Sequence, residues 1–129
     1  MVVAGLVLAG VAALIHVYIF YLESVVWTAP RTRAVFGVRS EQDALTTRAL
    51  AFNQGFYNLF LAVAVVAGIV VVAAGATAVG ATLVFTGAGM MVAASLVLVV
   101  SRPAMLRAAL IQGLPPLLGV VALAVGLAG

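Results

Sequence analysis

Residues 2–27 of the chain read VVAGLVLAGVAALIHVYIFYLESVVW, and Glu23 is the only charged side chain among them. A helix needs about 20 apolar residues to cross the hydrocarbon core of a bilayer, so this run is long enough to span one. Three further apolar stretches lie at about residues 49–74, 77–100 and 106–128. The sequence therefore predicts an all-α integral membrane four-helix bundle, with residues 1–129 forming a single transmembrane domain.

The overall composition excludes a soluble domain. Hydrophobic residues make up 67% of the 129 residues and charged residues 7%, whereas soluble domains have about 45–50% and about 25%. A chain this short cannot bury so much apolar surface in its own interior, so we expect membrane lipid to cover it. The net charge of +3 comes from six basic and three acidic residues. These are too few basic groups for a nucleic-acid-binding stripe, so no nucleic-acid partner is expected.

The connections between the predicted helices differ in charge. The first, Thr28 to Thr47, is polar and charged, the second, Ala74 to Ala81, is a turn of small residues, and the third is SRPAMLR at 101–107. All six arginines lie in or beside the first and third connections: Arg31, Arg33, Arg39, Arg48, Arg102 and Arg107. The positive-inside rule then predicts that both basic connections are cytoplasmic and that both termini are extracytoplasmic.

Small residues recur at four-residue spacing in the first helix, at Gly5, Ala9 and Ala13. Such a stripe lets two helix backbones approach closely. Tight packing inside one bundle explains it, and a homo-oligomer face remains the alternative.

Two polar residues of the first helix, His16 and Glu23, are candidate catalytic residues. They are seven positions apart, which puts them within about 20° of one face of an α-helix, and Trp27 falls on the same face. A carboxyl inside a membrane is costly unless it is paired or protonated, and it marks a functional site by default. A structural alternative exists for His16, which would then simply hydrogen-bond to a neighbouring helix.

Polar side chains also crowd the starts of the second and fourth helices. Asn53, Gln54, Tyr57 and Asn58 open the second helix, and Gln112 opens the fourth. Pro115 and Pro116 lack an N–H, so a kink or a freed carbonyl is expected near Ile111 and Gln112. In the predicted topology, these groups lie at the same depth in the membrane as His16 and Glu23. There they either line a cavity or only hold the helices together through hydrogen bonds.

Aromatic residues concentrate in the same half of the bundle. Tyr18, Tyr21, Trp27, Phe56 and Tyr57 are candidate substrate-binding residues together with Asn53, Gln54, Asn58 and Gln112. One histidine and one carboxylate fall short of the three or four ligands of a transition-metal site. The chain also has no P-loop and no dinucleotide fingerprint, so no metal or cofactor is expected.

Three segments resemble the DUF1304 family of small four-helix bacterial membrane proteins. They are HVYIFYLESVVWTAPRTRAVF (16–36), NQGFYNLFLA (53–62) and IQGLP (111–115). The similarity extends over the whole chain, with Pro116 as a departure where a small residue is expected. The resemblance implies a multi-pass protein of the bacterial inner membrane and supplies no reaction.

The first functional hypothesis is a membrane-embedded enzyme that cyclises or isomerises a lipophilic, isoprenoid substrate. Glu23 would protonate the substrate, aromatic rings would stabilise a carbocation, and His16 would orient the acid or accept a proton. By class analogy this is similar to small membrane terpene cyclases and sterol isomerases. It requires a cavity that connects Glu23, Asn53 and Gln112. The alternatives are a transporter or proton-conducting subunit, and a non-catalytic membrane accessory protein.

Overall fold

Four helices long and apolar enough to cross a membrane dominate the computed structural model, which describes residues 1–129. The first is α1 (Val2–Phe20), which continues as the π-helix η1 (Tyr21–Val25). The others are α3 (Glu41–Ala73), α4 (Thr77–Ser101) and α5 (Leu106–Ala128), with a short helix α2 (Pro30–Phe36) before α3 and a 3-10 turn η2 (Pro103–Met105) before α5. The prediction of an all-helical chain with four membrane-length helices is confirmed.

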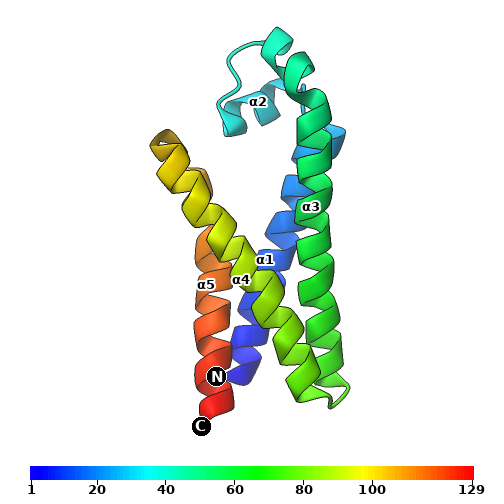
Figure 1. Ribbon diagram of the computed structural model, residues 1–129, viewed down its shortest axis with the longest axis vertical. Coiled ribbons are helices and arrows are strands. Elements are labelled where there is room, and N and C mark those ends of the chain that lie inside the picture. The colour runs from blue at the N-terminus through cyan, green and yellow to red at the C-terminus, as the bar shows by residue number, and fades with distance from the viewer.

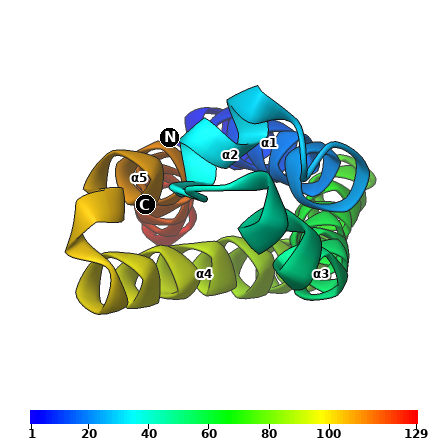
Figure 2. The same ribbon diagram turned by 90° about the horizontal axis from the view of Figure 1, so that it is seen from above.

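The four long helices form a ring in the order α1, α3, α4, α5, in which each helix packs against its two neighbours (Figure 2). Both termini lie at one end of the bundle, and α2 lies across the opposite end (Figure 1). From the turn that joins α3 to α4, the two helices diverge toward the end that carries α2. All six arginines lie toward the end that carries α2: two are in α2, Arg39 follows it, Arg48 is near the start of α3, Arg102 follows α4 and Arg107 is at the start of α5. We call this the basic end.

Small residues let the helices approach closely at the end that carries the termini. The core there includes Ala9, Ala13 and Leu123. A side chain at Gly5 would collide with the backbone of Leu123 in α5, so the predicted small-residue stripe of α1 is used within the bundle. Gly75, with φ of 95°, makes the tight turn between α3 and α4.

The second long helix begins earlier than predicted from the apolar residues. α3 starts at Glu41 instead of about residue 49, and the predicted loop 28–47 also contains α2. Ser40 caps α3, because its side chain accepts a hydrogen bond from the Asp43 N–H at 3.0 Å. This cap starts the helix about two turns before the apolar stretch. The polar residues of these two turns are therefore helical, and they lie at the basic end.

Most large apolar side chains face outward. Only 27 of the 129 residues are buried, and exposed side chains include Leu14, Leu50 and Val100. An apolar exterior on four membrane-length helices is typical of lipid-facing surface. Four such helices indicate a multi-pass membrane protein.

Candidate functional site

The first membrane-length helix ends in a π-helical turn, η1, on the side of the basic end. This turn contains Glu23. The Val26 N–H bonds to the carbonyl of Tyr21, five residues back, at 3.2 Å. Such wide turns inside α-helices are frequent at functional sites. The predicted helix to residue 27 is therefore interrupted, and Trp27 lies beyond its end and not on a helical stripe with His16 and Glu23.

Several contacts fix this π-helical turn against α3. The Ser24 hydroxyl donates to the Phe52 carbonyl at 2.8 Å. The Trp27 indole N–H donates to the Ala44 carbonyl at 3.1 Å and to the Thr47 hydroxyl at 3.2 Å. At Gly55, the backbone of α3 comes so close to Ser24 that a Cβ atom there would overlap its hydroxyl. The π turn thus directs two consecutive side chains, Glu23 and Ser24, to the same neighbouring helix.

Glu23 is buried, with 8% of its surface exposed. Its Oε2 accepts a hydrogen bond of 2.8 Å from Asn58 Nδ2, and the same Nδ2 also donates to the Gln54 carbonyl at 3.1 Å. Oε1 makes no hydrogen bond in the protein. Arg33 Nε is the only buried side-chain nitrogen or oxygen without a partner, so Oε1 must border accessible space. A single amide therefore holds the carboxyl and leaves one oxygen free.

His16 lies deeper in the bundle, with 2% of its surface exposed. Its Nδ1 is 2.8 Å from the Ala12 carbonyl of the same helix. A carbonyl oxygen only accepts, so Nδ1 carries the proton and, in the neutral ring, Nε2 holds a free lone pair. Nε2 makes no hydrogen bond, and like Oε1 of Glu23 it borders accessible space, because it is not a buried atom without a partner. His16 is thus not a hydrogen-bond link between helices, and it makes no direct bond to Glu23.

Aromatic rings of α1 and α3 meet beside this turn. Phe20 and Phe56 pack edge to face with ring centres 5.1 Å apart, and Phe52 and Phe60 flank Phe56. Phe20, Phe52 and Phe60 were not among the predicted site residues, because an apolar ring at helical spacing does not distinguish a site from a core.

The predicted site residues divide into two groups. Trp27, Phe56, Asn58 and Gln112 are at least partly buried, whereas Asn53 and Gln54 are exposed. Tyr18 and Tyr57 are 59% and 63% exposed, and Tyr21 stacks on Tyr18 at the outer surface. The structure therefore brings Glu23 together with Asn58 and does not join it to Asn53 or Gln112 by a hydrogen bond. α5 continues through Pro115 and Pro116 without a break, so the carbonyls of Ile111 and Gln112 lack their usual helical donors.

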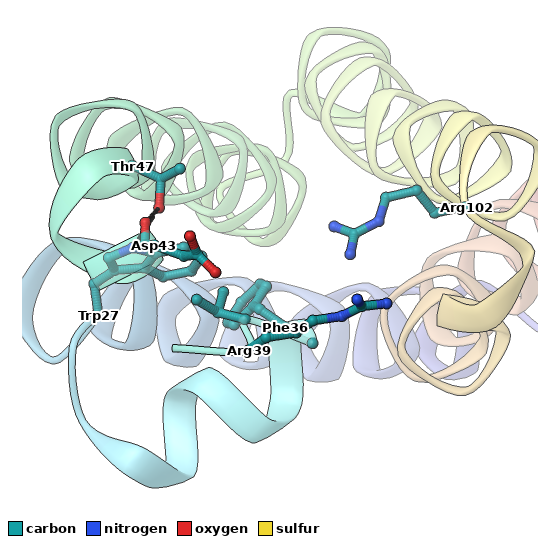
Figure 3. A pocket seen from close by; sticks show the side chains of 8 residues that line it. Trp27, Phe36, Arg39, Asp43, Thr47 and Arg102 are labelled. Carbon is teal, nitrogen blue, oxygen red and sulfur yellow. Dashed lines mark hydrogen bonds between the residues drawn. The ribbon is translucent and has the colours of Figure 1, made fainter. Parts of the chain in front are cut away.

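A cavity of about 340 Å³ opens at the basic end (Figure 3). Trp27, Phe36, Arg39, Asp43, Thr47 and Arg102 line it, with Gly37 and Val38. It lies beside the turn that carries Glu23. A second hollow of about 310 Å³ is wholly apolar and includes Val17 and Ala62. Glu23, Asn53 and Gln112 line neither hollow, so neither is the connecting cavity that the enzyme hypothesis requires. No group of three or more His, Cys, Asp or Glu side chains is arranged to hold a metal ion.

Sequence reasoning missed the lining of this cavity. Arg102 was interpreted only as a marker of topology and Asp43 only as a loop residue. Arg39 was interpreted as a marker of topology and, in the accessory-protein alternative, as part of an arginine-rich loop that contacts anionic headgroups or a partner. The available signal was the excess of arginines over acids in two connections that are far apart in the sequence. It did not reveal that α2 and the end of α4 meet over one hollow.

The comparison with known families decides what the chain is related to. The family model of DUF1304, described as a protein of unknown function, matches residues 10–124. The chain belongs to the DUF1304 family. No curated protein and no solved structure matches it. The match contains every candidate residue from His16 to Gln112, and the resemblance inferred from the three sequence segments is confirmed.

The arrangement in this DUF1304 protein places one carboxyl and one imidazole on the first membrane-length helix. Glu23 offers a free oxygen, and His16 offers a free Nε2 about 10 Å away along the helix axis. Phe20 and Phe56 pack together where the π-helical turn begins, and the faces of aromatic rings favour positive charge. Proton transfer to and from an apolar molecule is the chemistry that these groups support.

Proposed function

We propose that this DUF1304 protein is a membrane enzyme that isomerises or cyclises a lipophilic, isoprenoid substrate by acid-initiated proton transfer. The observation that carries the proposal is the free Oε1 of Glu23, a buried carboxyl held by one amide and bordering accessible space. A carboxyl inside a membrane is costly unless it is paired or protonated, and it marks a functional site by default.

The proposed reaction starts from protonated Glu23. The O–H proton moves to one carbon of a double bond, or to an epoxide oxygen, and a cation forms on the neighbouring carbon. Phe20 and Phe56 stabilise that cation through their ring faces. In a cyclisation, further double bonds attack the cation and move it along the chain, and the final proton is lost to His16 Nε2 from a carbon about 10 Å from Glu23. In an isomerisation, the proton is lost from an adjacent carbon to the Glu23 carboxylate itself. Exchange with solvent restores the groups that changed protonation state. Asn58 keeps Oε2 as an acceptor, which leaves Oε1 to carry the proton.

The proposed orientation puts the basic end in the cytoplasm and both termini outside, in a bacterial inner membrane. Every arginine belongs to the basic end, which favours this orientation by the positive-inside rule. The reacting groups then lie in the cytoplasmic half of the bilayer.

Transport or proton conduction has less support than catalysis. A conducting path would need polar groups through both halves of the bundle. In the half that carries the termini, helices touch through glycines, as at Gly68 and Gly80 of α3 and α4. The hydroxyl of Thr82 there bonds to its own helix, at the Ala78 carbonyl.

The test uses purified protein in lipid nanodiscs with prenylated olefins and epoxides, in deuterated water. We expect deuterium at carbon in the products of the olefins and opening of the ring in the epoxides, and we expect Glu23→Gln to lower both turnovers by about 10²-fold or more. Glu41→Gln is the matched control, because Glu41 is an exposed glutamate in the first turn of α3. Unchanged turnover in Glu23→Gln would refute the assigned acid and favour the accessory role.

A further inference from the structure

The cavity at the basic end contains two arginines without a carboxylate partner. Arg39 lies between α2 and α3, and Arg102 follows α4; their guanidinium groups both point into the cavity (Figure 3). Neither forms an ion pair within 4.0 Å. Two like charges that face one hollow repel each other unless an anion lies between them.

The turn after α2 lies beside the Arg102 side chain. Gly37 ends α2 with φ of 67°, a conformation that side-chain-bearing residues rarely adopt. A Cβ atom at residue 37 would be in ordinary van der Waals contact with Nη2 of Arg102, at 3.6 Å. The guanidinium that follows α4 therefore lies next to the end of α2, although the two are far apart in the sequence.

The chemistry of the lining favours a phosphate group. Guanidinium groups bind phosphate oxygens with paired, charge-assisted hydrogen bonds. Asp43 is the one acid in the lining, and it repels an anion, but the two arginines leave the cavity with a net positive charge. The volume of about 340 Å³ is within the range of small-molecule sites, about 300–1,000 Å³.

The other wall of the cavity is aromatic and leads into the bilayer-spanning part. Trp27 and Phe36 pack there with ring centres 5.1 Å apart. Trp27 follows Glu23 by four residues and lies just beyond the end of the π-helical turn. A phosphate held by the arginines would therefore leave the first carbons of an attached chain beside the turn that carries Glu23.

We infer that this cavity binds the phosphate or diphosphate head of an isoprenoid lipid whose chain extends toward Glu23. The inference rests on the proposed function, to which it adds the head group of the substrate. Arg39 and Arg102 bind the phosphate, and the rings of Trp27 and Phe36 pack against the first carbons of the isoprenoid chain. A free inorganic anion is the other source of the same chemistry, and the experiment separates the two.

The experiment measures binding through Trp27, the only tryptophan of the chain, whose ring lines the cavity. Protein in phosphatidylcholine nanodiscs is titrated with a prenyl diphosphate, with the matching prenyl alcohol and with inorganic pyrophosphate. We expect a saturable fluorescence change with the prenyl diphosphate at the lowest concentration, competition by pyrophosphate only at higher concentration, and no response to the alcohol. Arg39→Gln and Arg102→Gln should each weaken binding at least about tenfold.

Arg31→Gln and Arg107→Gln are the matched controls, because both arginines belong to the basic end and neither lines the cavity. These variants should bind within about twofold of the unchanged protein. Equal weakening by all four substitutions would show only a general positive surface and would overturn the inference. Equal affinity for pyrophosphate and prenyl diphosphate would overturn the lipid assignment. Glu23→Gln should bind normally, so a failure of catalysis is distinguished from a failure of binding.

Discussion

Asn58 is the single side chain that bonds to the carboxyl of Glu23, and it does so from another helix. Hydrogen bonds between membrane helices contribute about 0.6 kcal/mol on average and up to about 1.7 kcal/mol. We expect a double-mutant cycle of Glu23→Ala and Asn58→Ala to give a coupling energy of about 1 kcal/mol. Unfolding of the four proteins in mixed micelles measures it.

Asn53 provides the control for that cycle. It is an exposed amide one turn away on α3 and has no side-chain hydrogen bond to Glu23. The coupling between Glu23→Ala and Asn53→Ala should stay below about 0.5 kcal/mol. If both amides couple equally to Glu23, the hydrogen bond is not what joins this residue to α3.

The sequence predicted the importance of single residues better than their partners. Glu23 and His16 stand out because a polar group is costly in lipid, and this cost depends only on residue type and depth. The choice among Asn53, Gln54 and Asn58 depends on the rotation of α3 about its axis. It also depends on the π turn, which changes the direction of Glu23, and apolar periodicity determines neither.

At the scale of elements, the close approach of α3 to the π-helix η1 depends on Gly55. A Cβ atom there would lie 3.1 Å from Glu23 Cβ and would overlap the Ser24 hydroxyl. Gly55→Ala should therefore separate the two helices and lower the free energy of unfolding by about 1–3 kcal/mol. The melting temperature in detergent should fall.

Gly89 of α4 is the matched control for this substitution, since nothing lies within 4 Å of a Cβ atom there. An open glycine inside a helix gains about 0.5–1 kcal/mol when alanine replaces it. Gly89→Ala should thus raise the melting temperature, while Gly55→Ala lowers it. A rise in both would mean that no close contact exists at Gly55.

Helix ends were predicted less well than helix number. Four apolar runs give four spans because the thickness of the bilayer sets their length. The first residues of α3 are polar, however, and their helix depends on the Ser40 cap. The end of α1 depends on a π turn held by Ser24 and Trp27 through bonds to α3. Hydropathy averaged along the sequence does not detect such tertiary contacts, so it does not predict where these helices begin and end.

At the scale of the whole molecule, the charges and the reactive groups lie toward the same end. The basic end contains all six arginines, and Glu23 precedes Trp27, which lines the cavity there, by four residues. The opposite end is sealed by glycine and alanine contacts. A substrate with a charged head and an apolar chain suits this asymmetry, because its head would stay at the membrane surface while its chain entered the bundle.

The asymmetry also predicts how the protein lies in the membrane, and the absence of cysteine makes this directly measurable. Ala76→Cys adds a thiol in the exposed turn between α3 and α4, and Gln42→Cys adds one at the exposed start of α3. With the basic end in the cytoplasm, a membrane-impermeant maleimide should label only Ala76→Cys in intact spheroplasts. Both variants should be labelled after lysis, which controls for reactivity. Labelling of Gln42→Cys alone before lysis would reverse the orientation and would put the arginine cavity outside the cell.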